Sequence, residues 1–221
     1  MASPVFFVKK KDGKLQFIQD YRKLNTMTVR NTYPLPLVLD IINWISDSKA
    51  KYFTKLDVIW GYNNVRIKEG DKWKATFQTN RGLFEPLVMF FGLTNSLATF
   101  QTMMNDIFKD LIDEGHIAIY MDDILIYTQT IEHHWAVVTQ VLDVLQRHWL
   151  YLKAEKCSFE CSTVEYLGLV LSEGHIEMDP IKITGVQDWP TPKNVTEVQS
   201  FMGFINFYGS STIGSSLTSH M

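Results

Sequence analysis

The 221-residue sequence lacks the features that mark secreted, membrane-spanning and zinc-binding proteins. It has only two cysteines, Cys157 and Cys161, with no histidine pair beside them, which is too few ligands for a structural zinc site. A reduced intracellular thiol pair is their simplest interpretation. No apolar run reaches about 18 residues, and the chain does not begin with a signal peptide. We therefore expect a soluble protein that is not secreted and a cytoplasmic location.

A strong excess of either charge is also missing, because the formal net charge is −3. This average conceals a basic segment, since residues 1–30 hold seven basic side chains against Asp12 and Asp20 alone. Such a segment can follow a phosphate backbone or form a solvated loop, and composition leaves both interpretations open. Hydrophobic residues make up 46% of the chain, which at this length predicts one or two compact units.

The most informative stretch is residues 117–127, in which Asp122 and Asp123 interrupt an apolar run rich in Ile and Tyr. The two short, β-favouring halves predict buried strands with the aspartates at the bend between them. A polar hairpin turn is the simplest interpretation, because Asp is common in turns. The flanking apolar residues leave little wet surface, however, and a buried carboxylate is costly without a cation beside it.

A third carboxylate, Asp57, lies in a second predicted strand at residues 52–58, on the face opposite Leu56 and Val58. If this strand lies beside the hairpin, three carboxylates converge, and their repulsion requires divalent cations. All-oxygen ligands suit a hard ion such as Mg²⁺. Two such ions roughly 4 Å apart can hold the attacking and leaving oxygens of a phosphoryl displacement.

The Tyr-x-Asp-Asp box at residues 120–123, preceded by Leu56-Asp57 and by Gly61-Tyr62, resembles the active site of reverse transcriptases. Over about residues 3–208 the chain is similar to those of long-terminal-repeat retrotransposons of the gypsy class. The further motifs occur in family order at residues 3–5 (SPV), 9–13 (KKKDG), 20–25 (DYRKLN), 33–36 (YPLP), 82–85 (GLFE), 91–96 (FGLTNS), 166–168 (YLG) and 188–190 (DWP).

The resemblance implies an α+β chain with the right-hand polymerase fold. An antiparallel palm sheet would be backed by helices at about 94–114 and 132–149, beside a β-rich fingers subdomain. The implied divisions are fingers at 1–51, without their usual N-terminal part, and a palm strand with the first catalytic Asp at 52–68. The fingers return at 69–93, the palm follows at 94–178, the thumb begins at 179–208, and 209–221 form a flexible tail.

In the family the three carboxylates are catalytic and hold two magnesium ions, for which manganese can substitute. The metal ligands implied here are Asp57, Asp122, Asp123 and the carbonyl of Val58. The implied substrates are an RNA or DNA template with its primer, and dNTPs. The implied partners are the ribonuclease H and integrase parts of a parent polyprotein, in an intracellular particle and without a membrane.

The resemblance also implies a nucleotide site. Tyr62 follows Asp57 by five residues, which is the interval of the family's sugar gate, an aromatic residue whose ring excludes a ribose 2′-hydroxyl. Without the family interval, a packed core aromatic would be the alternative interpretation of Tyr62. Glycine allows close backbone approach, which suits Gly92 beside a nucleotide. The positions implied for nucleotide binding are Lys10, Lys11, Tyr62, Phe91 and Gly92, and those implied for gripping the primer are Leu167 and Gly168.

Two departures from the family pattern favour a second hypothesis. Gln16 stands where relatives have Arg, a stronger phosphate donor, and Leu97 stands where they have a first-turn Pro. A decayed or truncated, inactive fragment that at most binds nucleic acid is therefore the alternative. A metal nuclease built on the same aspartates is a third hypothesis, but it explains neither Tyr62 nor the basic segment.

Local patterns complete the expectations. Residues 65–68 and 73–77 are typical of strands, and a short helix is expected to begin at residues 179–180. Residues 194–197 (NVTE) predict a capping box. Adjacent helical residues point about 100° apart, so we expect His133 and His134 to be surface residues and not a metal pair.

Overall fold

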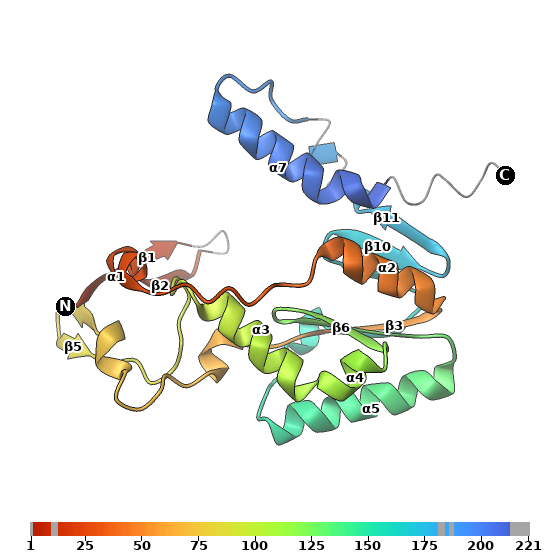
Figure 1. Ribbon diagram of the computed structural model, residues 1–221, viewed down its shortest axis with the longest axis horizontal. Coiled ribbons are helices and arrows are strands. Elements are labelled where there is room, and N and C mark those ends of the chain that lie inside the picture. Colours follow the sequence, from red (N-terminus) through yellow and green to blue (C-terminus); the bar gives the residue numbers. More distant parts are fainter. Residues whose placement is uncertain (1, 10–12, 181–183, 186–187, 213–221) are drawn as a thin grey trace. The chain divides into compact units, whose positions relative to one another are not determined.

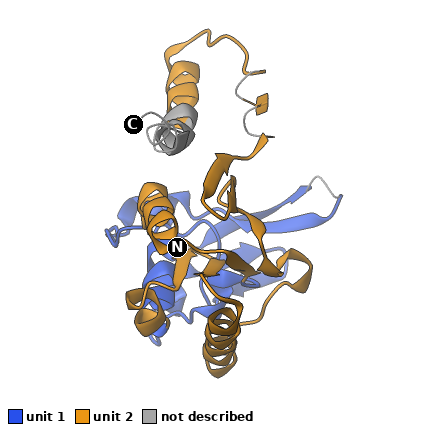
Figure 2. Ribbon diagram, turned by 90° about the vertical axis from the view of Figure 1, so that its right-hand side faces the viewer, with its two compact units in different colours: residues 1–35, 58–107 blue, residues 36–57, 108–221 orange. Residues whose placement is uncertain are grey.

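The computed structural model describes residues 2–9, 13–180, 184–185 and 188–212, with the backbone alone for 204–212. The chain forms two compact units. Unit 1 comprises residues 1–35 and 58–107, and unit 2 comprises residues 36–57 and 108–221 (Figure 2). Each unit is therefore assembled from two separate stretches of chain.

Unit 1 is built around a four-stranded sheet in the order β2-β1-β4-β5. Its strands are β1 (Ser3–Lys9), β2 (Leu15–Gln19), β4 (Phe77–Thr79) and β5 (Gly82–Phe84), and its helices are α1 (Arg22–Met27), η1 (Gly61–Asn64), η2 (Lys72–Ala75) and α3 (Ser96–Ile107). The strand expected at 65–68 is wrong, because an isolated bridge between Arg66 and Val88 is all the pairing recorded there. Most of the strand expected at 73–77 is the short helix η2, whose C-cap Thr76 donates a hydroxyl hydrogen bond to the Trp73 carbonyl.

Unit 2 is built around the antiparallel sheet β6-β7-β3-β8. Its strands are β3 (Tyr52–Asp57), β6 (Ile117–Tyr120), β7 (Asp123–Thr128) and β8 (Ser158–Cys161). Side chains alternate between the two faces along each strand. One face carries Phe53 and Leu125, which belong to a buried cluster with Ile41 and Ile45 of α2 (Val38–Ser48).

The opposite face of this sheet packs on α5 (Ile131–Arg147), and in Figure 1 the strands lie between α2 and α5. A second sheet, β11-β10-β9, adds Val164, Leu169 and Leu171 to the cluster under α2. Its strands are β9 (Thr163–Tyr166), β10 (Leu169–Ser172) and β11 (His175–Met178). The helix expected at 132–149 agrees with α5 to within two residues, but the one expected at 94–114 is divided at Phe108 into α3 and α4 (Lys109–Asp113).

The last described helix is α7 (Val195–Thr212). The Asn194 Oδ1 accepts a hydrogen bond of 2.9 Å from the Glu197 backbone amide, which confirms one half of the predicted capping box. In return, the Glu197 carboxylate accepts from the backbone amide of Lys193 and from the side-chain amide of Asn194. The expected flexible tail starts at residue 209, yet α7 continues to Thr212, because extending a helix costs less than starting one. Residues 213–221 and most of the helix expected after residue 180 lie outside the described residues. No helix in the described part of the chain is long and apolar enough to cross a membrane.

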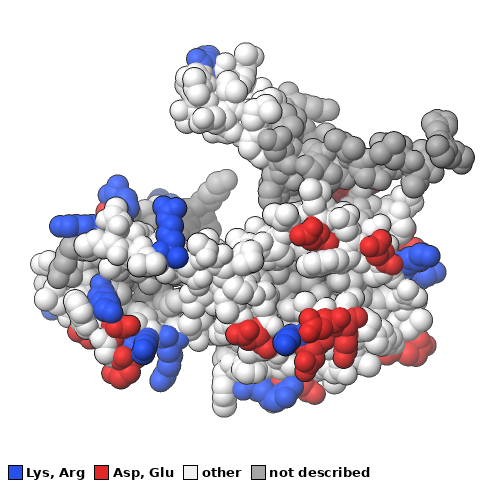
Figure 3. Space-filling model, in the orientation of Figure 1, with Lys and Arg blue, Asp and Glu red and all other residues white. Residues whose placement is uncertain are grey.

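Charge is divided unevenly between the two units. Unit 1 has twelve Lys and Arg against six Asp and Glu, whereas unit 2 has nine against eighteen. The net charges are therefore +6 and −9, which together give the −3 of the whole chain. In Figure 3 the basic side chains are most frequent over the elements of unit 1 and the acidic ones over those of unit 2.

Candidate active site

The pairing of β3 with β7 brings two of the three predicted carboxylates together. Asp57 is the last residue of β3, Asp123 is the first residue of β7, and the two are direct partners across the antiparallel ladder. Directly opposed residues project to the same face with Cβ atoms about 5 Å apart. Asp122 precedes Asp123 in the hairpin turn between β6 and β7. The bend that the apolar run predicted is therefore where the structure places it.

Burial dominates the electrostatics of Asp123. Desolvation raises the pKa of its carboxyl, and the neighbouring charges of Asp122 and Asp57 raise it further. Lys55 and Lys156 oppose this shift by lowering the pKa. The carboxyl thus has like charges near it and is partly removed from water. Cations relieve this crowding.

One such cation is Lys156, in the short helix η3 (Ala154–Lys156). Its Nζ lies 2.9 Å from Oδ2 of Asp57, and this contact raises the pKa of the lysine. The Asp57 side chain is only 11% exposed, whereas that of Lys156 is 57% exposed. The segment is anchored separately, because the backbone amide of Lys153 donates a hydrogen bond of 2.9 Å to the Asp57 carbonyl. Sequence reasoning missed Lys156, which lies 99 residues from its partner.

The hairpin turn contains an unusual backbone conformation. Met121 has a φ of 57°, in the left-handed region that favours glycine. A non-glycine residue there costs roughly 1–2 kcal/mol. Backbone strain of this kind concentrates at functional sites, where the surrounding structure holds it in place. Here the pairing of Tyr120 with Asp123 closes the turn and fixes the aspartates at its tip.

Tyr166 connects the hairpin to the predicted primer-gripping residues. Its buried hydroxyl lies 3.3 Å from the carbonyl of Asp123 and 3.4 Å from that of Ala118. The next two residues, Leu167 and Gly168, both have positive φ and form the turn between β9 and β10. The YLG motif thus anchors its first residue against β7 and places the other two in an adjoining tight turn.

The histidine pair differs from expectation. His134 is fully buried, and its Nε2 and Nδ1 lie 2.7 and 2.9 Å from the hydroxyls of Thr54 and Thr128. Thr128 also donates to the Thr130 carbonyl, and Thr54 accepts from the Glu160 amide. This network assigns the neutral tautomer with the proton on Nδ1. The expectation that both histidines are surface residues is wrong for His134, because Thr54 and Thr128 supply the partners that allow an imidazole to be buried.

Unit 1 brings two of the predicted nucleotide-binding residues into contact. The rings of Tyr62 and Phe91 meet edge to face with centroids 4.8 Å apart, and Phe100 packs on Tyr62 at 5.7 Å. Gly92 has a φ of 92°, which a side chain would strain, and its carbonyl accepts a hydrogen bond of 2.7 Å from the Asn25 amide. The Asn25 Oδ1 also accepts from the amide of Thr94. Asn25 therefore fixes this turn, a role that sequence reasoning did not assign.

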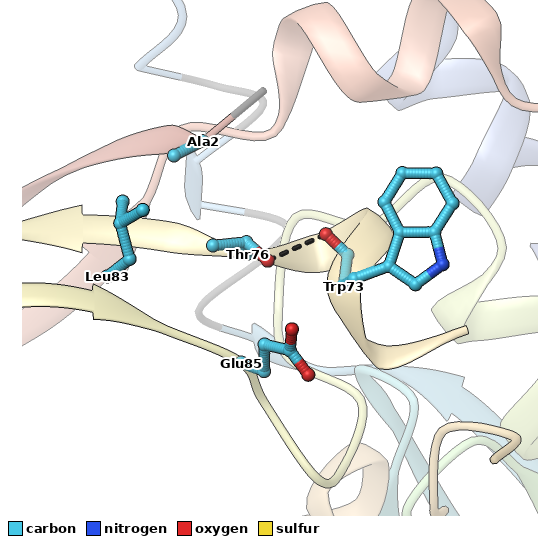
Figure 4. A pocket seen from close by; sticks show the side chains of 5 residues that line it. All are labelled: Ala2, Trp73, Thr76, Leu83 and Glu85. Carbon is cyan, nitrogen blue, oxygen red and sulfur yellow. Dashed lines mark hydrogen bonds between the residues drawn. The ribbon is translucent and has the colours of Figure 1, made fainter. Parts of the chain in front are cut away.

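The remaining predicted site positions are placed as follows. Val58 follows Asp57 in the chain and is buried. Lys10 and Lys11 lie outside the described residues. Figure 4 shows a pocket in unit 1 that none of the predicted site residues lines. Its lining residues are Ala2, Trp73, Thr76, Leu83 and Glu85.

Asp57, Asp122 and Asp123 together form the carboxylate cluster. Their side-chain oxygens are ligands that suit a hard divalent cation, and Oδ2 of Asp57 already contacts the ammonium of Lys156. Among the described residues, no three His, Cys, Asp or Glu side chains lie close enough to hold one metal ion. Magnesium does not require such a cage, because it is usually bound by one or two carboxylates together with water and substrate phosphates. The paired Asp57 and Asp123 fit that requirement.

Comparison with known proteins identifies the family. Residues 8–171 match the family model described as reverse transcriptase (RNA-dependent DNA polymerase). The chain belongs to the reverse transcriptase family. The resemblance to the gypsy-class enzymes, drawn from the sequence motifs, is thereby confirmed.

Similar sequences occur in transposon polyproteins. The Tf2-3 and Tf2-7 transposon polyproteins of Schizosaccharomyces pombe are 38% and 37% identical to this chain over 206 residues. The match covers 93% of this chain but only 15% of each polyprotein. The chain thus spans about a seventh of the length of these relatives.

Solved structures establish the reverse transcriptase fold. A foamy viral protease-reverse transcriptase in complex with double-stranded DNA matches with a TM-score of 0.83 at 24% identity, covering 94% of this chain and 36% of that one. Another, in complex with an RNA/DNA hybrid, matches with a TM-score of 0.77 at 22% identity, covering 94% and 27%. These likenesses confirm the predicted right-hand polymerase fold.

Proposed function

We propose that this chain catalyses RNA-directed DNA polymerisation as the reverse transcriptase part of a retrotransposon polyprotein. The observation that supports it most is the direct pairing of Asp57 with Asp123, next to Asp122 in the hairpin turn. The reaction transfers a nucleotide from a dNTP to the 3′-hydroxyl of a primer and releases pyrophosphate. Such a transfer needs negative charge to be neutralised at a point where several oxygens meet.

Asp57, Asp122 and Asp123 would hold two Mg²⁺ ions, or Mn²⁺ in their place, with the Val58 carbonyl as a further ligand. When bound, such ions favour loss of the hydroxyl proton from the primer and neutralise the charge of the triphosphate. The protein contributes position: the β3–β7 ladder fixes two carboxylates, and the β6–β7 turn holds the third. Tyr166 supports this arrangement through its hydrogen bond to the Asp123 carbonyl.

Residues of unit 1 would bind the nucleotide. The Tyr62 ring would exclude ribonucleotides, and its contact with Phe91 would keep it in one orientation. Gly92 would let the backbone approach the nucleotide, and Lys10 and Lys11 would meet the triphosphate. In unit 2, Leu167 and Gly168 would contact the primer end.

The proposed partners follow from the relatives. The solved foamy viral enzymes are complexes with double-stranded DNA and with an RNA/DNA hybrid, so we propose a template-primer duplex as the partner of this chain. Its transposon relatives are polyproteins, which supports linkage to ribonuclease H and integrase parts. A particle in the cytoplasm is the corresponding location.

Primer extension on an RNA template tests the proposal. Asp122→Asn replaces a carboxylate by a neutral amide of similar shape. It should lower magnesium-dependent extension by at least about a thousandfold, because the site would lose one negatively charged metal ligand. The exposed Asp47→Asn on α2 is the matched control and should extend like the parent. Extension unchanged by Asp122→Asn would contradict the mechanism. No extension by the unaltered chain, combined with magnesium-independent RNA binding, would favour the inactive fragment.

A further inference from the structure

The carboxylate cluster has a positively charged side chain of the protein already bound to it. Lys156 Nζ contacts Oδ2 of Asp57 at 2.9 Å, and its charge also acts on Asp122 and Asp123. No other ion pair recorded for the described residues involves any of the three aspartates, whose side chains are predicted to bind metal. The Lys156 ammonium therefore contacts a carboxylate oxygen that would be a ligand of a divalent cation.

The two partners of this ion pair differ in how easily they can separate. Asp57 is 11% exposed and cannot regain full hydration in place, so it needs a cation beside it. Lys156 is 57% exposed, and its long flexible side chain can transfer the ammonium to water. Release of Lys156 therefore costs little, provided that another cation takes over the charge of Asp57.

Release of the ammonium need not move the backbone. The Lys153 amide bonds to the Asp57 carbonyl, and the Lys156 amide bonds to the Lys153 carbonyl at 2.8 Å. Both contacts involve main-chain atoms alone. The loop can thus stay against β3 while the Lys156 side chain turns outward.

We propose that Lys156 is a built-in counter-ion that neutralises Asp57 in the metal-free protein and competes with the divalent cation for the same carboxylate. The site is then held together before metal arrives, and metal binding displaces the ammonium. This inference rests on the proposed function, because it takes the three aspartates as the metal-binding groups.

Binding of Mn²⁺ alone, measured from the electron paramagnetic resonance signal of the free ion, tests the competition without any turnover. Lys156→Met should bind Mn²⁺ about twofold to fivefold more tightly than the parent, a range set by the modest strength of a half-exposed ion pair. Lys153→Met is the matched control, because it removes the same charge three residues away, where the ammonium lies 3.8 Å from Oε1 of Glu155. Lys156→Arg keeps the charge and should bind like the parent.

The outcomes separate this inference from the proposed function. If Asp57→Asn leaves Mn²⁺ binding unchanged, the aspartates are not the metal site, and both proposals fail. If Asp57→Asn abolishes Mn²⁺ binding but Lys156→Met binds Mn²⁺ no more tightly than Lys153→Met, the counter-ion role of Lys156 is overturned and the proposed metal site is retained. Circular dichroism of each variant establishes that it is folded before its affinity is compared.

Discussion

The two units of this chain differ in charge and in the kind of contact that holds their predicted site residues. Unit 1 is basic, with a net charge of +6, and its predicted site residues Tyr62 and Phe91 are joined by aromatic packing. Unit 2 is acidic, with −9, and its predicted site residues are carboxylates held by strand pairing and by a lysine. The net charge of −3 for the whole chain thus conceals one basic unit and one acidic unit.

The difference also concerns how each site is stabilised. The Tyr62–Phe91 contact in unit 1 should tolerate replacement with a small loss of stability, because Tyr62 is only partly buried and Phe91 is exposed. In unit 2, the polar or charged residues Thr54, Asp57, Thr128 and His134 are buried, and removing one member of a buried hydrogen-bonded pair leaves its partner unsatisfied. We therefore expect changes in unit 1 to alter selectivity or affinity and changes in unit 2 to alter stability or catalysis.

The largest expected effect in unit 1 concerns sugar selection. Tyr62→Val removes the ring that would meet the 2′-hydroxyl, so incorporation of ribonucleotides relative to deoxynucleotides should rise roughly tenfold to a hundredfold. Single-nucleotide primer extension with each substrate measures the ratio. Tyr62→Phe keeps the ring and should behave like the parent. An unchanged ratio for Tyr62→Val would reject the gate.

In unit 2 the next effect is on stability. His134→Gln disturbs the hydrogen bonds to Thr54 and Thr128 and should lower the free energy of unfolding by about 2 kcal/mol. The exposed His148→Gln, just after α5, is the control and should change it little. Urea unfolding at pH 7.5 followed by circular dichroism supplies the comparison. A loss no larger than that of the control would show that the buried network contributes little.

The same variant should flatten the pH dependence of stability. Burial, followed by the charge of His133, lowers the pKa of His134 in the folded state, so the unfolded chain binds its proton more readily. The contribution of neutral His134 to the free energy of unfolding is therefore fully present above about pH 6.5, the ordinary pKa of histidine. It is lost as the pH falls below that value, because the unfolded chain takes up the proton first. His116 has its pKa lowered in the same direction, also chiefly by burial, and leaves a residual slope. An identical slope in parent and His134→Gln would contradict the neutral assignment.

The smallest expected effect compares the charges of the two units directly. Lys23→Gln in unit 1 should weaken binding of an RNA/DNA hybrid severalfold and reduce its salt dependence by about one ion. Lys109→Gln in unit 2 also removes a charge from an exposed residue and should leave both quantities unchanged. Fluorescence anisotropy over a series of salt concentrations measures them. Equal losses of affinity for the hybrid in the two variants would contradict the expectation that unit 1, and not unit 2, binds nucleic acid through its positive charge.

Local patterns predicted the parts of the site that are encoded by short stretches. The apolar run around Asp122 and Asp123 gave the hairpin, and alternation around Asp57 gave β3, because strand periodicity depends only on neighbouring residues. That β3 lies beside β7 could not be derived from either stretch alone. The convergence of Asp57 with the hairpin aspartates required the two strands to be neighbours, and only the family resemblance implied that they are.

Features that depend on distant partners escaped prediction. Lys156 meets Asp57 across 99 residues, and nothing in its local sequence marks it as a partner of the cluster. His134 is buried because Thr54, 80 residues away, accommodates its ring nitrogen. The β-favouring Trp73, Thr76 and Phe77 suggested a strand over residues 73–77, but Trp73 lies in η2 with Lys74 and Ala75, two residue types that are depleted in strands.

The most direct test of this account is the anomalous scattering of Mn²⁺ in crystals of the protein. The account predicts a peak in bonding contact with the carboxylates of both Asp57 and Asp123, with the Lys156 ammonium withdrawn from Asp57. A saturating soak that leaves Lys156 on Asp57, with manganese bound only elsewhere, would contradict it.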